Sequence, residues 1–372
     1  MIKKRSKPTF LDKLVRSAAL VLAIALVLGF LAGRFDPREY KYFPFFGLAY
    51  PFVLALNVLM ILWWCLRKRW VFAISTVVLI VLGGQAFHAT FGLIGNSGEG
   101  PKRNEEYIRM MTYNVHSFKP YGTDNVEAVK QQMLELIGKE NPDIICFQEY
   151  FTRKKGPYDM TDSLKRILKT SYFYFEPTMK NNYESYGLAI FSRYPIKDKG
   201  HIIFNEEPGG NTSIYTDVQV RNQRIRVYNV HLQSIAFQEQ DYNYIDKVAH
   251  KMDPDLVPSK RILSMLKRAF LKRSQQVDIM KQHMKTCKTP FIIAGDFNDT
   301  PASYAVRRMT DSLYNTFKEQ GTGLSRTYNG KFPNFQIDYI AATKDFKVLN
   351  YRVTEAQLSD HFPVRSDLKL NP

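Results

Sequence analysis

The sequence predicts an α/β domain built on β-sheets, preceded by a membrane region of about three transmembrane helices. Two observations predict this arrangement. Between residues 101 and 372, short apolar runs rich in β-branched and aromatic residues alternate with helical or irregular stretches. Within the first hundred residues, three apolar stretches approach or reach the length of about 20 residues that crosses a bilayer. A length of 372 residues fits one large domain with such an appendage.

Three apolar stretches are predicted to cross the membrane as helices, at residues 14–33, 45–66 and 70–94. Each is apolar around its whole circumference, which argues against helices buried in a soluble core. The basic start of the chain also fits a secretory signal peptide, but two further stretches follow and favour a retained anchor. Residues 1–95 are therefore predicted to be the transmembrane region. Residues 96–104 are predicted to be a polar, glycine-rich linker to a domain at 105–370.

Basic residues near the ends of the predicted spans indicate how the chain crosses the membrane. Short loops rich in Lys and Arg tend to stay in the cytoplasm. Six such residues precede residue 17, and the second loop is Arg67-Lys68-Arg69, so both segments are predicted to lie inside. Three spans from an inside start place the following domain on the outer face. We therefore expect a multi-pass protein of a bacterial inner membrane with an extracytoplasmic, periplasmic domain.

Seven segments of this domain are predicted to be strands, because they are apolar and β-rich. They cover residues 107–115, 143–148, 186–192, 214–220, 225–232, 290–296 and 336–341. Residues 127–140 are predicted to form a helix that ends at Asn141-Pro142. Residues 101–372 carry 40 Lys and Arg against 31 Asp and Glu, which is the balance of a soluble domain with a modest basic excess.

The long segment 234–289 separates two predicted strands and contains an amphipathic helix at 258–285. Its apolar residues recur near helical spacing, and Lys and Arg fill the positions between them. One interpretation is a basic helix that touches a membrane surface or an anionic substrate. The other is a helix laid on the sheet with its charged face in water, and we favour this more common arrangement.

Polar side chains that can bind a metal or move a proton follow the predicted strands. Glu149 ends an almost wholly apolar strand, where a carboxylate is costly to bury unless it is paired or bound to a metal. A salt bridge would explain this carboxylate equally well. Oxygen ligands suit Mg²⁺ or Mn²⁺, and a Mg²⁺ site needs only one or two protein carboxylates. Glu149 is therefore the first choice of metal ligand.

Two further strand ends carry pairs of polar residues that point the same way. Asp296 and Asn298 alternate across one residue and could act together on a phosphate, although a turn would use the same residue types. Asn229 and His231 repeat this spacing and place an amide and an imidazole on one face. Histidine titrates near neutral pH, so it can donate a proton or bind a phosphate.

Asp338 and the pair Asp360-His361 lie near the end of the chain. A carboxylate beside an imidazole fixes the tautomer and raises the basicity of the ring, so Asp338 and His361 could activate a water molecule. An ordinary turn before Pro363 is the alternative. The sequence has no glycine-rich phosphate loop, no nucleophile elbow and no Cys/His cluster with zinc spacing. These absences leave hydrolysis by a metal-assisted water.

Seven short motifs, in order, make the sequence resemble the endonuclease/exonuclease/phosphatase family, also called deoxyribonuclease-I-like. They are Tyr-Asn-Val at 113–115, Gln-Glu at 148–149, Tyr-Gly-Leu-Ala-Ile-Phe-Ser-Arg-Tyr-Pro-Ile at 186–196, Asn-Val-His-Leu at 229–232, Gly-Asp-Phe-Asn at 295–298, Ile-Asp-Tyr-Ile at 337–340 and Ser-Asp-His-Phe-Pro at 359–363. The resemblance implies a four-layered α/β sandwich, in which two packed mixed β-sheets are flanked by helices. It also implies cleavage of a phosphoester with Mg²⁺ (or Mn²⁺) at one sheet edge.

The resemblance further implies roles for individual residues. The implied metal ligands are Glu149, Asn114 and Asp360. The implied catalytic residues are His231, Asp296, Asn298, Asp338 and His361. The implied substrate-binding residues are Asn114, Asn229 and Tyr186.

These observations together predict a membrane-anchored, metal-dependent phosphoesterase. Its substrate is predicted to be nucleic acid, a phospholipid or a small phosphorylated molecule, and its partner is the lipid bilayer. No protein partner can be inferred from the sequence. The alternative is a catalytically silent, membrane-bound interaction protein with the same fold. Loss of Glu149, Asp296 or His361 would favour that alternative, and the sequence retains all three.

Overall fold

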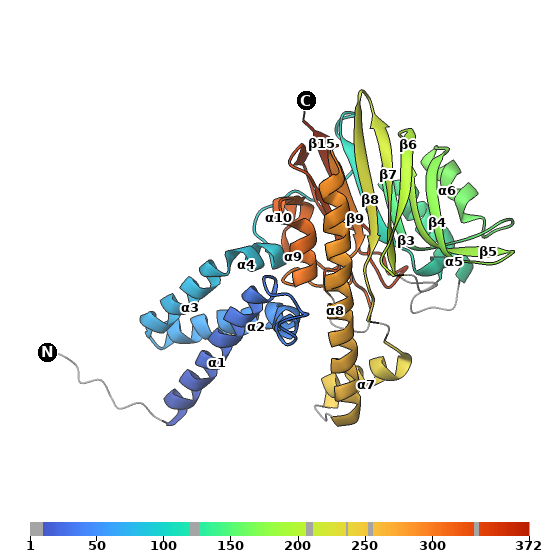
Figure 1. The fold of residues 1–372 in the computed structure, drawn as a ribbon. Coiled ribbons are helices and arrows are strands. Elements are labelled where there is room, and N and C mark those ends of the chain that lie inside the picture. The colour runs from blue at the N-terminus through green and yellow to red at the C-terminus, as the bar shows by residue number, and fades with distance from the viewer. Residues whose placement is uncertain are drawn as a thin grey trace. The chain divides into compact units, whose positions relative to one another are not determined.

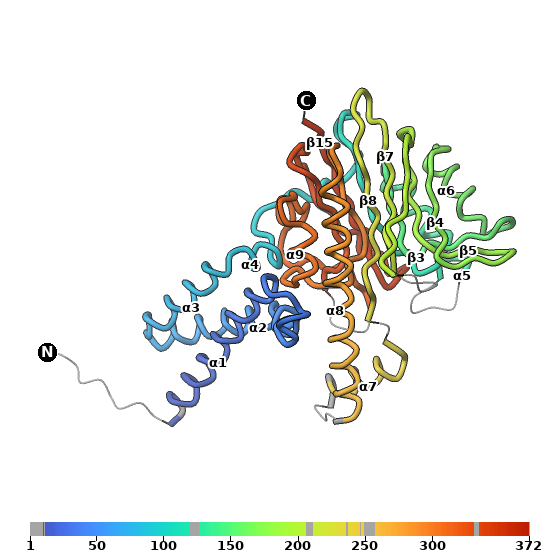
Figure 2. The backbone as a smooth tube through the Cα atoms, viewed as in Figure 1, coloured from blue at the N-terminus to red at the C-terminus, as the bar shows by residue number. Residues whose placement is uncertain are grey.

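The chain divides into two compact units. The computed structural model describes residues 10–119, 126–205, 211–235, 237–251, 256–330 and 335–371. One unit contains Met1–Thr90 with Ala302–Tyr304, and the other contains Phe91–Pro301 with Ala305–Pro372. The first unit is built from helices, whereas the second contains sheets flanked by helices (Figure 1). Figure 2 traces the same backbone as a tube.

The first unit contains α1 (Phe10–Ala32), α2 (Phe43–Leu66), α3 (Trp70–Leu82) and α4 (Gly84–Thr90). Helices α1 and α2 are each long and apolar enough to cross a membrane. Helices α3 and α4 meet the same test only as a pair, and they are bent by 76° at the break between them. The unit therefore offers two candidate membrane spans, or three if the bent pair is one span.

The third span expected from the sequence, residues 70–94, differs from the structure at its middle and at its end. Gly83 and Gly84 stand at the break, and glycine is a poor helix former that lets the helix axis turn. After Thr90 the chain forms the short strand β1 (Phe91–Gly92), which pairs with β11 (Gly323–Leu324). The single helix expected over 70–94 is therefore replaced by two helices and a strand.

Helices α1 and α2 pack side by side through a polar contact and a small residue. The buried side-chain amide of Asn57 donates to the carbonyl of Leu22 at 3.1 Å and to that of Val53 at 2.8 Å. A Cβ added to Gly29 would lie 2.9 Å from the ring of Tyr50, so only glycine permits this close approach. Such contacts are typical of helix pairs in a bilayer, where van der Waals packing and hydrogen bonds drive association.

The second unit contains two mixed β-sheets. The six-stranded sheet has the order β10 (Tyr314–Asn315), β12 (Asp338–Ala342), β9 (Phe291–Asp296), β8 (Gln223–His231), β7 (Thr212–Val220) and β6 (Ile196–Ile203). The seven-stranded sheet has the order β13 (Phe346–Val348), β15 (Val364–Leu370), β2 (Ile108–Asn114), β3 (Ile144–Arg153), β5 (Glu184–Ser192) and β4 (Tyr172–Lys180), with β14 (Arg352–Val353) paired to β15. Among the described strands, β2 pairs with β3 and β8 with β9 in parallel, and the other neighbours are antiparallel.

The second unit also contains helices, some of which cover the outer faces of its two sheets (Figure 1). They are α5 (Val126–Glu140), α6 (Met160–Leu168), α7 (Glu239–Lys251), α8 (Leu256–Thr286), α9 (Tyr304–Thr310) and α10 (Thr316–Gln320), with a 3₁₀ helix η1 (His116–Phe118). Met110 of β2 and Val227 of β8 share the core between the sheets. Met111 points to the opposite face and packs under α5 and α6, because side chains alternate along a strand. The predicted α/β fold with two packed mixed sheets is therefore confirmed.

Helix α8 lies on the six-stranded sheet, which is the arrangement favoured from the sequence. Leu266, Phe270 and Val277 are buried. The hydroxyl of Tyr228 in β8 lies 3.1 Å from His283 Nδ1 in α8. The N-terminal turns of α8, together with α7, extend beyond the carboxyl end of β8 (Figure 1). The helix thus has one half on the sheet and one half beside the edge where β8 ends.

The predicted linker at 96–104 is hydrogen-bonded to the second unit. The backbone N–H of Asn96 donates to the carbonyl of Gln320, and the carbonyl of Asn96 accepts from Tyr351. Lys102 Nζ lies 2.8 Å from Asp143 Oδ2. The chain therefore leaves the helical unit at Thr90, and the residues after it belong to the sheet unit.

Candidate active site

Parallel strands bring polar residues to one edge of the two-sheet unit. Strand β2 ends at Asn114, β8 at His231 and β9 at Asp296. Glu149 lies in β3, the parallel neighbour of β2. Because the carboxyl ends of parallel strands point the same way, these side chains gather at one edge. Asp338 opens β12 and lies directly opposite Asp296 in the β12–β9 pair.

Glu149 occupies a β-bulge. The pairing of β3 with β5 shifts in register between Phe147 and Tyr150, and Glu149 has a φ of 51°. A bulge re-aims a side chain, and a positive φ in a non-glycine residue costs on the order of 1 kcal/mol or more, so it persists only where the surroundings hold it. Burial opposes ionisation of Glu149, but a hydrogen bond from His116 and three nearby imidazoles lower its pKa to about 2. The carboxyl is therefore ionised at neutral pH.

His116 lies between two carboxylates and was not among the residues expected from the sequence. Its Nδ1 is 3.5 Å from Glu149 Oε2 and 3.6 Å from Asp360 Oδ1. The hydrogen bond to Glu149 raises the pKa of His116 against the effect of burial, and Asp360 adds to the rise. His116 follows the motif Tyr-Asn-Val by one residue, so its position in the sequence was the available signal.

Asp296 is the central acceptor of the site. Its Oδ1 accepts from the backbone N–H of Asn298 at 2.8 Å, and its Oδ2 accepts from the side-chain amides of Asn298 at 3.2 Å and Asn114 at 3.1 Å. The side chain is 1% exposed. Burial raises the pKa of Asp296, and the neighbouring Asp338 raises it further, although His361 and His231 oppose the rise.

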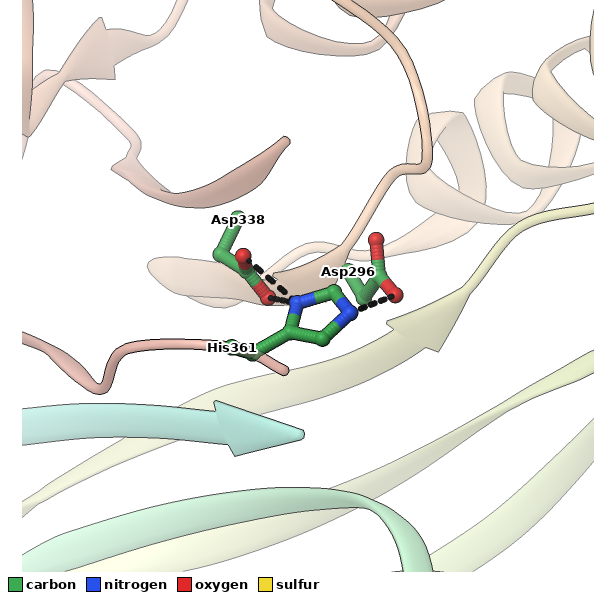
Figure 3. A group of neighbouring side chains, drawn as sticks. All are labelled: Asp296, Asp338 and His361. Atoms are coloured by element: carbon green, nitrogen blue, oxygen red, sulfur yellow. Dashed lines mark hydrogen bonds and ion pairs between the residues drawn. The ribbon is translucent and has the colours of Figure 1, made fainter. Parts of the chain in front are cut away.

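His361 lies between two carboxylates of the six-stranded sheet. Figure 3 shows its ring with Nδ1 toward Asp338 and Nε2 toward Asp296. Nδ1 is 3.0 Å from Asp338 Oδ2, and Nε2 is 3.7 Å from Asp296 Oδ2. Burial alone would lower the pKa of His361, but the charges of Asp338 and Asp296 outweigh it and raise the pKa well above its usual value. The two carboxylates therefore favour the imidazolium form of this ring.

His231 and Asn298 complete the polar cluster beside Asp296. His231 Nε2 is buried, lies 3.7 Å from Asp296 Oδ2 and has no hydrogen-bond partner among the described residues. A buried polar atom without a partner is costly, so this nitrogen is suited to a group of the substrate. Asn298 has a φ of 53° and donates its amide to the carbonyl of Leu232 at 3.0 Å. That bond ties the end of β9 to the end of β8.

Asn229 and Tyr186, both expected to bind substrate, lie in different surroundings. Asn229 is fully buried, and its amide donates to the carbonyls of Phe147 at 2.9 Å and Ala189 at 3.0 Å. Its Oδ1 accepts from Gln148, so its polar atoms brace the two sheets instead of facing the site. Tyr186 is half-buried beside Glu149, and burial together with that carboxylate raises the pKa of its phenol.

A tyrosine pair beside the site had no signal in the sequence. The ring of Tyr328 meets that of His361 edge-on, with centroids 5.4 Å apart. The hydroxyl of Tyr328 lies 3.2 Å from that of Tyr242 in α7. Helix α7 therefore contacts the polar edge of the sheets through Tyr242 and Tyr328, and no local motif around Tyr328 marks that contact.

Two sets of donors at this edge could hold a divalent cation. The ligand atoms of Asp296, Asp338 and His361 all lie within 4.8 Å of one another, so these buried residues form one candidate metal group. The second set consists of Glu149, Asn114 and Asp360. Its carboxylate and amide oxygens match the preference of Mg²⁺ and Mn²⁺ for oxygen ligands.

Comparisons with known proteins agree with this geometry. A phospholipase C of Staphylococcus aureus is 23% identical over 313 residues, which cover 71% of this chain and 88% of that protein. An endonuclease/exonuclease/phosphatase family protein from Bacteroides thetaiotaomicron superposes with a TM-score of 0.52 at 16% identity, covering 72% of this chain and 98% of that chain. A family protein from Bacteroides vulgatus gives a TM-score of 0.52 at 18% identity, covering 71% and 99%. These structures share the fold.

Two family models match separate parts of the chain. A domain of unknown function (DUF8431) matches residues 12–90, the helical unit. The model of the endonuclease/exonuclease/phosphatase family matches residues 111–361 and includes every polar residue gathered at the sheet edge. This match spans more than half of the chain, and the two-sheet fold agrees with it. The chain therefore belongs to the endonuclease/exonuclease/phosphatase family.

Proposed function

We propose that the protein is a metal-dependent phosphoesterase in which water attacks phosphorus directly. The observation that carries this proposal is the side-chain amide of Asn114. Its Nδ2 lies 3.3 Å from Glu149 Oε1 and 3.1 Å from Asp296 Oδ2. Asn114 thus links Glu149, an ionised carboxylate suited to a metal, with Asp296, a carboxyl group suited to proton transfer. Phosphoester hydrolysis needs both within reach of a single phosphate.

Glu149, Asn114 and Asp360 are the proposed ligands of Mg²⁺ or Mn²⁺. The alternative group includes His361, whose Nδ1 is engaged by Asp338 and whose raised pKa keeps the ring protonated. A ring nitrogen must be deprotonated to bind a metal, so that group suits proton transfer better. A bound cation would polarise a phosphoryl oxygen and neutralise negative charge that develops during attack.

Asp296 is the proposed acceptor of the water's proton. Burial raises its pKa toward neutrality, and a general base is most effective when its pKa lies near the working pH. The backbone N–H of Asn298 holds one oxygen of Asp296 at 2.8 Å, and the side-chain amides of Asn298 and Asn114 hold the other, so the carboxylate is fixed in position beside the proposed water. His361, held by Asp338 and positively charged, stabilises the negative charge that develops on the phosphoryl group.

His231 is the proposed contact to the phosphate. Its buried Nε2 has no hydrogen-bond partner among the described residues and can donate to a phosphoryl or leaving oxygen. The side-chain amide of Asn298 donates to Asp296 Oδ2 and to the carbonyl of Leu232, so Asn298 positions Asp296 beside the phosphate. Both residues end or follow strands of the six-stranded sheet, so they are held rigidly relative to the attacking water.

The proposed substrate is a phosphodiester, either in a phospholipid or in nucleic acid. The identity to a phospholipase C and the apolar N-terminal helices support the lipid class. The basic excess of the chain, with a net charge of +17, supports polyanions in general. The two-sheet fold is compatible with both, because fold alone does not fix the substrate.

The test is hydrolysis by the full-length protein in detergent micelles. The panel contains phosphatidylcholine, phosphatidylinositol, DNA, RNA and phosphorylated sugars, each with Mg²⁺, Mn²⁺ or chelator. We expect cleavage of one class that stops in chelator. Glu149→Gln should lower the rate about a thousandfold, because it removes the proposed anionic ligand of the metal.

A control variant tests whether replacing any glutamate of these strands by glutamine lowers the activity. Glu184 lies in the neighbouring strand β5 and pairs with Arg153 at the surface, so Glu184→Gln should retain full activity. Cleavage that persists in chelator, or an active Glu149→Gln protein, would refute the proposed metal site. No cleavage of any substrate, with Mg²⁺ binding demonstrated by calorimetry, would support the silent interaction protein instead.

A further inference from the structure

A pocket opens beside the catalytic edge between α8 and the chain that follows β8. Its volume is about 390 Å³. Gln233, Ser234 and Ile235 form one wall, beginning two residues after His231. The other wall is a stripe of α8 that carries basic side chains. These lining residues are Arg261, Met265, Arg268 and Lys272, spaced so that they share one face of the helix.

Buried hydrogen bonds fix the pocket relative to the catalytic residues. Arg273 is 1% exposed and donates Nη1 to the carbonyl of Gln233 and Nε to Asp299 Oδ2, both at 3.0 Å. The backbone N–H of Gln233 donates to Gln276 Oε1 at 2.8 Å. Two residues of chain span at most about 7 Å, so Gln233 lies within that distance of His231. The pocket is therefore held in a fixed position next to the active site.

The pocket carries positive charge that its surroundings leave uncompensated. Arg261 is paired with Asp241, with Nε to Oδ1 at 3.1 Å. Arg268 and Lys272 are exposed and have no acidic partner within the part of the chain that the structure describes. Two like charges one helical turn apart repel each other, and an anion between them would relieve the repulsion. The concave shape suits a discrete anionic group better than a flat lipid surface.

We propose that this pocket is a second phosphate subsite, which binds a phosphate of the substrate other than the one attacked. The inference rests on the proposed phosphoesterase function and narrows its substrate to molecules with at least two phosphates. Such a substrate is either a nucleotide chain or a headgroup that carries an additional phosphate. In both, the second phosphate would contact Arg268 and Lys272 while the first lies at His231 and Asp296.

The experiment measures equilibrium binding to the full-length protein in detergent and chelator, where turnover does not occur. Thymidine 3′,5′-bisphosphate is compared with thymidine 5′-phosphate, and glycerophosphoinositol 4-phosphate with glycerophosphoinositol. We expect the second phosphate to tighten binding about tenfold in one of these pairs, as two partly exposed ion pairs would. Arg268→Ala/Lys272→Ala should abolish that preference, and the pair that shows it identifies the source of the phosphate.

The control removes the same charge elsewhere on the chain. Lys285 and Lys288 are exposed, lie at or beyond the end of α8 and do not line the pocket, so Lys285→Ala/Lys288→Ala should keep the preference. A wild type without preference in either pair, or an equal loss in both double variants, would overturn the proposal. A third outcome would also overturn it: if Arg268→Ala/Lys272→Ala weakened only the binding of the protein to phosphatidylglycerol vesicles and kept the preference for the second phosphate, the basic stripe of α8 would be a membrane contact. Failure of hydrolysis alone would count against the proposed function and leave this binding ratio intact.

Discussion

Asp338 contacts the polar edge of the sheets through another residue, His361. Its two carboxylate oxygens lie 3.0 and 3.2 Å from His361 Nδ1, and its backbone N–H donates to Thr327 Oγ1 at 3.0 Å. The carboxylate is therefore fixed, and it fixes the ring. Because the charge of Asp338 is a main cause of the raised pKa of His361, removal of that charge would favour a neutral ring at neutral pH.

Asp338→Asn should lower kcat by about 10² to 10⁴ while the affinity for Mg²⁺ changes little. The range is that of a lost proton-transfer or orienting group, and the substitution leaves the proposed ligands Glu149, Asn114 and Asp360 in place. Steady-state kinetics and calorimetric titration with Mg²⁺ measure the two quantities. If Asp338→Asn abolished metal binding and Glu149→Gln did not, the metal would belong to the Asp296–Asp338–His361 group.

Asn229 should prove structural. Asn229→Ala would remove the side-chain donor to the carbonyls of Phe147 and Ala189 and one of the two acceptors of Gln148 Nε2 in the core. Each buried unsatisfied group costs about 1–3 kcal/mol, so unfolding should become easier by at least about 2 kcal/mol. The KM of the remaining active protein should stay near that of the wild type. A large rise in KM with unchanged stability would restore the expectation that Asn229 binds substrate.

Single residues were predictable where they stand in a strand-end motif. His231, Asp296, Asp338 and His361 gather at one edge because each ends, begins or flanks a strand, whereas Glu149, expected at a strand end, reaches that edge from a bulge inside β3. Asn229 was expected to face the site but is fully buried. A spacing of two residues predicts that Asn229 and His231 share one face of the strand, but it does not predict how deeply each side chain is buried between the sheets. The contact of Tyr242 with Tyr328 spans 86 residues, and no local pattern encodes such a pairing.

Two strands of the seven-stranded sheet are joined by a buried ion pair. Arg109 of β2 lies opposite Asp367 of β15, with Nε to Oδ1 at 2.7 Å and Nη2 to Oδ2 at 2.9 Å. The side chain of Asn350 adds a hydrogen bond to the same carboxylate. Burial opposes ionisation of Asp367, but these hydrogen bonds lower its pKa below the usual value. The pair holds β15, and therefore the chain after His361, against β2.

Asp367→Asn should destabilise the sheet unit by about 3–5 kcal/mol at neutral pH, because it leaves the buried Arg109 without its counter-ion. The pKa of Asp367 is lower in the folded than in the unfolded protein. Its ionised form therefore contributes fully to the free energy of unfolding above the unfolded-state pKa of about 4, and this contribution is lost as the pH falls through the folded-state pKa. The difference between wild type and variant should therefore narrow in acid. Hydrogen exchange of peptides from β2 and β15 measures the stability difference between the wild type and Asp367→Asn. A stability difference that is the same at pH 2 as at neutral pH would contradict this account.

Elements were predictable to the extent that their pattern is local. The seven strands expected from apolar runs correspond to β2, β3, β5, β7, β8, β9 and β12. Strand β6 (Ile196–Ile203) was not expected, because Lys197, Asp198 and Lys199 give it the composition of a loop. It forms because pairing with β7 supplies its backbone hydrogen bonds at the sheet edge. Edge strands tolerate such charges, which discourage further pairing.

The number of candidate membrane spans depends on α3 and α4. Helix α3 has 13 residues and is about 20 Å long, short of a hydrocarbon core of about 30 Å. The break at Gly83 keeps its backbone paired, since Gly83 N–H donates to Leu79 and its carbonyl accepts from Ala86 and Phe87. A break with its hydrogen bonds intact can lie at membrane depth. The polar residues of α4, Gln85 and His88, suit an interface with water.

We predict that α3 and α4 together cross the bilayer, with α4 reaching the outer interface, so the sheet unit is extracytoplasmic. Alkaline phosphatase fused after residue 100 should be active and a green fluorescent protein at that point dark, whereas fusions after residue 68 should behave in the opposite way. The residue 68 fusions are the internal control, because Arg67-Lys68-Arg69 is expected inside. Inside signals at both positions would mean that the bent pair returns without crossing, which leaves two spans and a cytoplasmic catalytic edge. Outside signals at residue 68 would instead invert the whole orientation, because the basic loop would then have crossed the membrane.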